Sequence, residues 1–414
     1  MPKERNQFVD IMRGIAMLLV VLDHTMTGCT VGAEKSFLFN IVWSLQMPLF
    51  ILISGYVTRY SPPITTGKDL LSHFKRRTLS YMLPWAVWSF LIRGLLFGQS
   101  EFLNVKHLLW NMDSGYWFLA TIWTISLIFG TASFAAEKIG GDRRVKRQAV
   151  HVSVYLLGMA LLAAIGFAFG LSFLAIKLTL YYMPFFYAGY LYGQYRDRIV
   201  STSVGKNVSE CVVAACFVVW LFVILRYSLY EMSDGGVAIL LRAGTSLAGC
   251  IAVCGLCKGL FTNNYMRGGA TDRTKFHGNL PHALPAIESN QAEYNADDVR
   301  SPRTGVDYSQ LHCDTCTDNG NCGTAAQKQN TAFSVVRKMG ISRYIIWCGK
   351  HSLEIYLLHG LVLNLLKSGS EVHFESIEGI FLTAGNFLIT AGLCTLTISL
   401  LEQNKLLRKV MRVC

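Results

Sequence analysis

The sequence is poor in charged residues. Only 15% of its 414 residues are charged, whereas 52% are hydrophobic. A soluble globular protein carries more charge, about a quarter of its residues, so the composition argues against that class. Apolar runs of roughly 20 residues, the length that a helix needs to cross a bilayer core of about 30 Å, recur along nearly the whole chain. We therefore expect an integral membrane protein.

The apolar runs lack the strict alternation that the strands of a membrane barrel require. Because only helices and closed barrels satisfy every backbone polar group in hydrocarbon, the expected class is an all-α polytopic bundle. The formal net charge is +12, but Lys and Arg lie in short loops between apolar runs and not on one soluble face. The positive charge therefore indicates membrane topology, and nucleic acid is not expected as a partner.

Three further features are missing from the sequence. No small-residue cleavage site in a polar setting follows the first apolar run, so we expect a retained first helix. Most of the 12 Cys lie within apolar runs or near their ends, where free thiols behave as small hydrophobes, and they do not predict a disulfide framework. No internal repeat is evident, which weakens the case for a transporter built from inverted repeats.

The hydrophobic pattern predicts about ten transmembrane helices. They are expected near residues 9–30, 38–58, 79–98, 116–136, 150–169, 172–193, 209–229, 236–257, 344–366 and 379–400. Loops after the even-numbered helices carry the positive charge, as between Arg59 and Arg77 and between Lys138 and Arg147. We expect these loops and both termini to be cytoplasmic, in a multi-pass protein of the cell membrane.

A polar segment divides the chain. Residues 1–257 are expected to hold the first eight helices, 258–342 a cytoplasmic and largely disordered loop, and 343–414 the last two helices with a basic cytoplasmic tail. Residues 267–332 have few aliphatic side chains, which favours disorder. This segment holds one cluster of potential metal ligands: His312, Cys313, Cys316 and Cys322. The cluster lacks the second ligand pair of a zinc site, so no metal is expected.

The first expected helix contains four ionisable residues, Asp10, Arg13, Asp23 and His24. A charged group near the bilayer centre costs a few kcal/mol or more unless it faces protein or water, so its default interpretation is functional. Arg13 and His24 lie within about 20° of the same helix face and about 17 Å apart along the axis. Asp10 and Arg13 are neighbours that can neutralise one another, a contact that would also serve structure alone. Asp23 and His24 point about 100° apart, so the carboxylate is not assumed to orient the imidazole.

His24 is the residue of this helix best suited to remove a proton from a hydroxyl group. An imidazole has the unperturbed pKa nearest neutrality, which makes it a good general base. The alternative is a histidine that serves only as a hydrogen-bonded contact between helices. The position of His24 in the sequence does not by itself favour either the general base or the structural contact.

Several separated motifs strengthen the functional interpretation. They are Arg13 and His24 as Arg-x10-His; Met47-Pro48-Leu49-Phe50 through Ser54-Gly55-Tyr56; Trp117-Phe118-Leu119; Pro184-Phe185-Phe186 with Gly189-Tyr190; and Gly349 through Ser352-Leu353 to Tyr356-Leu357-Leu358-His359. Together they resemble the acyltransferase 3 family of membrane O-acyltransferases, in the branch of the fucose 4-O-acetylases. Each motif is weak alone, but they occur in order over nearly the whole chain.

The resemblance implies transfer of an acyl group, most simply acetyl from acetyl-CoA, to a hydroxyl of a surface polysaccharide or a lipid-linked sugar. It implies a catalytic set of His24 as general base, Arg13 and Asp10, with Arg13 either holding the polar stripe in place or stabilising the thioester oxygen. Lys75, Arg76 and Arg77 are expected to bind the phosphates of acyl-CoA. Here the chain departs from the family, because the second arginine of its Arg-x-x-Arg pattern is absent. Without the resemblance these cations are topological anchors.

A tunnel is expected to connect the basic loop with His24, which lies beyond the bilayer midpoint. Its expected lining residues are Asp23, Ser54, Trp117, Tyr356 and His359. Trp117 is equally well explained as an anchor at the membrane interface. Two other functions remain open: a glycan or lipid transporter or flippase that uses the buried charges for substrate or proton binding, and a sensor that retains the fold without turnover.

Overall fold

The computed structural model describes residues 6–141, 143–200, 203–232, 235–275, 340–366 and 371–403. Its principal helices are α1 (Gln7–Cys29), α2 (Phe37–Val57), α3 (Gly67–Ala86), α4 (Val105–Trp110), α5 (Trp117–Gly140), α6 (Arg144–Phe169), α7 (Ile176–Val200), α8 (Ser203–Arg226), α9 (Gly236–Lys275), α11 (Ile341–Lys350), α12 (Ser352–Leu366) and α13 (Ile377–Gln403). Within these ranges the only β-type pairing is an isolated bridge between Val31 and His373. The predicted all-α class is confirmed.

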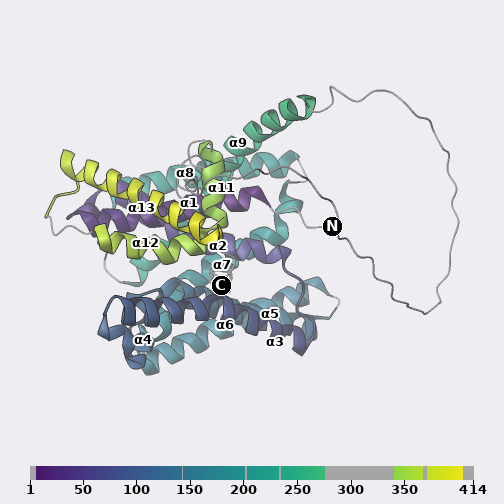
Figure 1. The fold of residues 1–414 in the computed structure, drawn as a ribbon. Coiled ribbons are helices and arrows are strands. Elements are labelled where there is room, and N and C mark those ends of the chain that lie inside the picture. The colour runs from purple at the N-terminus through teal and green to yellow at the C-terminus, as the bar shows by residue number, and fades with distance from the viewer. Residues whose placement is uncertain are drawn as a thin grey trace, which may run out of the picture.

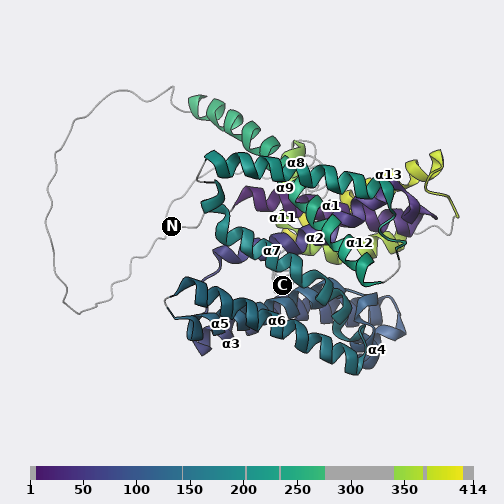
Figure 2. The ribbon, with the colours of Figure 1, turned by 180° about the vertical axis from the view of Figure 1, so that it is seen from behind.

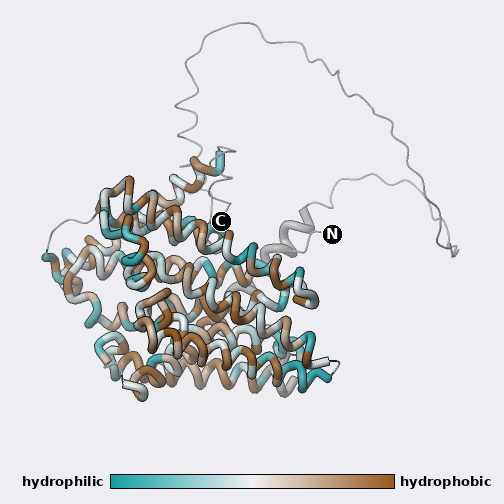
Figure 3. Tube along the Cα trace, turned by 90° about the horizontal axis from the view of Figure 1, so that it is seen from below, coloured by the Kyte–Doolittle hydropathy of each residue, from teal (hydrophilic) through white to brown (hydrophobic). Residues whose placement is uncertain are grey.

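Six of the described helices are long and apolar enough to cross a membrane: α2, α5, α6, α8, α9 and α13. The protein is therefore a multi-pass membrane protein, while the count of ten spans and their orientation stay predictions. Large apolar side chains such as Leu157, Leu161, Val218 and Phe222 point outward from α6 and α8, as expected of surfaces that face lipid. Brown, hydrophobic stretches run along the helices in Figure 3, and teal, hydrophilic residues gather toward their ends.

Two expected spans differ from the structure in their local course. The third is not one regular helix, because α3 continues into a π-helical segment, Val87–Leu96. The ninth is divided at His351, where α11 ends and α12 begins. Residues 276–339, which include the cysteine cluster near His312, lie outside the described part of the chain.

The helices form two layers that both views of the ribbon show (Figures 1 and 2). One layer contains α3, α4, α5 and α6, and the other contains α1, α2, α8, α9, α11, α12 and α13. Helix α7 lies between them and packs against α2 on one side and against α5 and α6 on the other. Segments from both ends of the chain thereby meet around α1, which packs against α2, α11, α12 and α13.

Glycines allow two helix pairs to approach closely. A Cβ atom at Gly14 would meet the carbonyl of Ile345, and one at Gly349 would meet the carbonyl of Asp10, so α1 and α11 touch through their backbones. Gly55 and Gly189 form the same kind of reciprocal contact between α2 and α7. Small residues at such crossings let membrane helices gain van der Waals contact, which drives their association where lipid offers no hydrophobic force.

Replacing Gly14 by Ala is expected to destabilise the protein, because α1 and α11 must separate to admit the methyl group. Over-packing of this kind costs about 1–3 kcal/mol. The thermal unfolding of the detergent-solubilised protein measures the effect. Gly385→Ala is the matched control, since a Cβ there meets nothing within 4 Å. Equal melting temperatures for the two variants would contradict this account of the α1–α11 contact.

Candidate functional site

The two carboxylates of α1, Asp10 and Asp23, face the protein interior. Asp10 is only 2% exposed and Asp23 only 8%, although both lie in a helix of a membrane bundle. Buried carboxylates of this kind are tolerated in a membrane only where protein or water surrounds them. The close contact of α1 with α11 at Gly14 supplies part of that enclosure. The carboxylates of the expected polar stripe are therefore turned toward neighbouring helices, whereas the His24 side chain at its far end is about half exposed.

Asp23 and His24 form a carboxylate–imidazole pair at the far end of α1. His24 Nδ1 lies 3.0 Å from the Val20 carbonyl oxygen and 3.2 Å from Asp23 Oδ2. A carbonyl oxygen only accepts, so Nδ1 carries the proton of this hydrogen bond and Nε2 is the basic nitrogen of the neutral ring. The sequence did not predict this contact between Asp23 and His24, because the side chains of consecutive helical residues point about 100° apart. In the structure the His24 ring folds back onto the preceding turn of the helix, where Nδ1 lies beside both the Val20 carbonyl and the Asp23 carboxylate.

His359 lies against His24 from α12. The two rings meet edge to face with their centroids 5.0 Å apart, and His359 is only 3% exposed. His359 Nδ1 lies 3.1 Å from the Ile355 carbonyl oxygen, the same arrangement that fixes the His24 ring. The His24 side chain is 51% exposed. One face of this imidazole therefore touches buried protein while the rest is open to the exterior.

Tyr356 connects the two histidines with a cavity deeper in the bundle. Its ring centroid lies 5.7 Å from that of His359, and Phe118 and Tyr116 of the α5 region hold it at 5.4 Å and 6.0 Å. Tyr356 also lines a cavity of about 310 Å³, here named the inner cavity. Arg13 and Ser54 line the same cavity. The polar residues of α1, α2 and α12 thus converge on one space.

A second cavity of about 640 Å³, here named the basic cavity, lies between α3, α5, α6 and α7. Five arginines line it: Arg59, Arg76, Arg77, Arg144 and Arg147. Arg77 lines the inner cavity as well, and its Nη1 donates to the Tyr81 hydroxyl over 3.2 Å. The two cavities therefore share Arg77 in their walls.

Asp69 is one of two carboxylates in the wall of the basic cavity, with Glu137. It closes the capping box at the start of α3 with Thr66. Hydrogen bonds from the backbone and the hydroxyl of Thr66 hold the pKa of the Asp69 carboxyl below its ordinary value. Asp69 therefore remains ionised at neutral pH and serves the fold of α3. The arginines still outnumber the carboxylates, so the cavity is suited to an anion.

The predicted site residues fall into distinct groups. Arg13, Ser54 and Tyr356 line the inner cavity, Arg76 lines the basic cavity, and Arg77 lines both. A separate cluster beside Tyr356 consists of Asp23, His24 and His359. These last three line neither cavity, and the remaining three predicted residues lie outside both the cavities and this cluster. Lys75 is exposed, the Asp10 carbonyl packs on Gly349, and Trp117 stacks on Tyr182 with ring centroids 5.6 Å apart.

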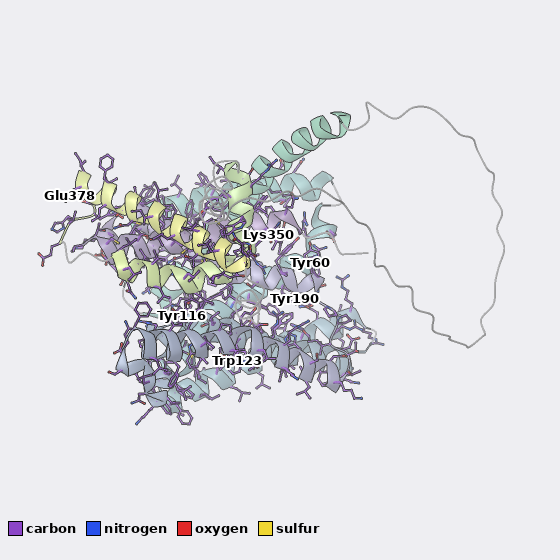
Figure 4. The ribbon with its side chains drawn as sticks, viewed as in Figure 1. Tyr60, Tyr116, Trp123, Tyr190, Lys350 and Glu378 are labelled. Carbon is purple, nitrogen blue, oxygen red and sulfur yellow. The ribbon has the colours of Figure 1, made fainter. Side chains whose placement is uncertain are left out.

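The sequence alone missed several residues of the site. Arg144 and Arg147 were interpreted only as topological charges, and Lys350 and Glu354 in the inner cavity were not singled out as a site. In Figure 4, Lys350 belongs to the layer of α1 and α11, and Tyr190, which lines the basic cavity, lies between the two layers. No local pattern marks these residues, because only the packing of distant helices brings them together.

Comparison with known proteins adds to this geometry. The model of the acyltransferase 3 family, described as an acyltransferase domain, matches residues 6–266. The nodulation protein NolL of Sinorhizobium fredii is 24% identical over 240 residues, which are 52% of this chain and 58% of that protein. The chain thus covers less than two thirds of this relative's length. No solved structure matches the chain significantly.

The family match includes α1 with Arg13 and His24, α3 with its arginines, and the whole wall of the basic cavity. The late motif at Tyr356 and His359 lies beyond the matched residues, and the fucose 4-O-acetylase branch stays a prediction. Because the match covers more than half of the chain, this protein, which holds several helices long and apolar enough to cross a membrane, belongs to the acyltransferase 3 family.

Proposed function

We propose that this protein transfers an acetyl group from acetyl-CoA to a hydroxyl of a surface polysaccharide or a lipid-linked sugar at the cell membrane. The proposal rests on one arrangement of side chains. Arg77 lines both the basic cavity and the inner cavity. Tyr356, in the wall of the inner cavity, packs against His359, which in turn packs against His24. In this proposal the thioester of a donor held in the basic cavity passes Arg77 into the inner cavity and moves on toward His24, which lines neither cavity. The cytoplasmic side is the proposed side of donor entry.

His24 is the proposed general base. Its Nε2 takes the proton of the acceptor hydroxyl while the hydroxyl oxygen attacks the thioester carbonyl carbon. The tetrahedral intermediate then expels the CoA thiolate, which takes the proton from the imidazolium, and the products are the acetyl ester and CoA. Asp23 at 3.2 Å from Nδ1 stabilises the imidazolium, as the carboxylate of a catalytic triad does. The exposed side of His24 is where an acceptor sugar would arrive.

Arg13 serves a different part of the donor. It lies about 17 Å from His24 along the helix axis, and helical side chains lean toward the N-terminus, so Arg13 points away from the imidazole. A single thioester carbonyl cannot contact both groups. We therefore assign Arg13 to holding the donor's arm in the inner cavity and not to stabilising the oxyanion at His24.

Replacing His24 by Ala is expected to reduce acetyl transfer by about 10²–10⁴-fold, the usual contribution of a general base. Membranes that contain the variant are incubated with radiolabelled acetyl-CoA, and label in the glycan fraction is counted. His107→Ala is the control, because His107 lies on the short helix α4 and lines neither cavity. Full activity of the His24 variant would remove the proposed base. Transport of an unlabelled glycan by the wild type would instead support a transporter.

Replacing Asp23 by Asn is expected to lower kcat at least about tenfold, equivalent to about 1.4 kcal/mol, because the imidazolium loses its charged partner. The KM for acetyl-CoA is expected to change little, since Asp23 lines neither cavity. Steady-state kinetics with labelled donor separate the two parameters. Glu101→Gln removes an exposed carboxylate elsewhere and is expected to be neutral. A raised KM with an unchanged kcat would place Asp23 in donor binding.

A further inference from the structure

The arginines of the basic cavity come from opposite walls. Arg76 and Arg77 belong to α3, whereas Arg144 and Arg147 belong to the first turn of α6. Helix α5 packs against both α3 and α6 and so brings these distant segments to one space. The arrangement offers two pairs of guanidinium groups, and a guanidinium fork is well suited to binding a phosphate group bidentately.

The two pairs differ in their relation to the inner cavity. Arg77 lines both cavities, whereas Arg144 and Arg147 line only the basic cavity. A donor whose thioester reaches inward past Arg77 must leave its opposite end in the part of the basic cavity bounded by α6. In CoA the order from the thiol is pantetheine, diphosphate and 3′-phosphoadenosine. The diphosphate then lies near Arg76 and Arg77 (the α3 pair), and the 3′-phosphate lies near Arg144 and Arg147 (the α6 pair).

Arg144 and Arg147 line the basic cavity, and each has further contacts, of which the one with Glu137 is to another lining residue. Arg147 lies 3.4 Å from Glu137 Oε2 and donates to the Gly141 carbonyl over 3.2 Å. The Arg144 guanidinium lies 5.6 Å from the centroid of the Tyr195 ring. By contrast, Arg59 pairs with Asp197 at 2.7 Å. With one carboxylate against two guanidinium groups, the α6 side keeps an excess of positive charge for an anion.

Aromatic rings line the same cavity. Phe129, Phe186 and Tyr190 lie in its wall with His151, and the rings of His151 and Tyr190 stack with their centroids 4.8 Å apart and their planes 20° apart. Flat rings beside cationic side chains are the surfaces on which nucleobases stack. This part of the cavity therefore offers an aromatic wall beside cationic side chains, the surroundings that suit a purine attached to a phosphate.

We infer that Arg144 and Arg147 bind the 3′-phosphate of CoA and thereby select 3′-phosphorylated donors over dephospho-CoA thioesters. This inference rests on the proposed use of acetyl-CoA. It gives the basic end of α6 a role in donor specificity, in addition to the role of its positive charge in setting the orientation of the protein in the membrane.

The test compares acetyl-CoA with acetyl-3′-dephospho-CoA as donors for the full-length protein in membranes. The wild type is expected to show a KM for acetyl-CoA at least about tenfold lower than that for the dephospho donor, the size of one charge-assisted phosphate contact. In the double variant R144Q/R147Q the KM for acetyl-CoA is expected to rise to that of the dephospho donor. The ratio of the two KM values then falls to about one.

The double variant R143Q/K146Q is the matched control. It removes two cations from the same end of α6, both exposed and neither in the cavity wall, and is expected to keep the wild-type ratio. Should R144Q/R147Q fail to fold, inhibition of the wild type serves instead: adenosine 3′,5′-bisphosphate is expected to inhibit at least about tenfold more strongly than AMP.

The outcomes separate this inference from the proposed function. Equal use of the two donors by the wild type overturns the inference while acetyl transfer from CoA stands. A ratio in R144Q/R147Q that stays at the wild-type value overturns it in the same way. Absence of transfer from either donor to any acceptor overturns the proposed function and the inference together.

Discussion

The structure depends on enclosing the charges of α1. Two carboxylates, a guanidinium and an imidazole on one membrane helix are tolerated only where protein or water replaces lipid around them. Helices α2, α11, α12 and α13 provide that enclosure, and the backbone contacts at Gly14 and Gly349 bring α11 close enough to do so. The break at His351 follows from the same need, because it turns α12 so that Tyr356 and His359 lie beside α1.

Enclosure also determines how the site is reached. The basic cavity lies between α3, α5, α6 and α7, and Arg77 lines both this cavity and the inner cavity. His24 is approached from the other side, where its ring is exposed. In the proposed reaction the donor and the acceptor would therefore meet at the His24 imidazole without sharing an entrance. This separation suits a reaction between a soluble nucleotide thioester and a glycan at a membrane surface, as we propose.

Much of the fold was predictable because it follows from local physical constraints. Runs of apolar residues must be helical in a bilayer, and ionisable groups within them must turn inward, so the class and the polar face of α1 at Asp10 and Asp23 followed from the sequence. The motif resemblance indicated the family, which the match over residues 6–266 confirms. The break at His351 and the π-helical course after α3 were missed. Gly349 and Pro84 lie just before these positions, but membrane helices also tolerate Gly and Pro in their interiors, so neither residue predicted a change of course.

The sequence by itself determined that this is a helical membrane protein with a charged first helix and basic segments near α3 and α6. Only the tertiary structure decided which of those charges share a space. It brought Arg144 and Arg147 opposite Arg76, left Lys75 outside, and set Asp23 against the His24 ring. The physical reason is that helix periodicity fixes which face a residue occupies, whereas contacts between helices far apart in the chain depend on how their surfaces pack.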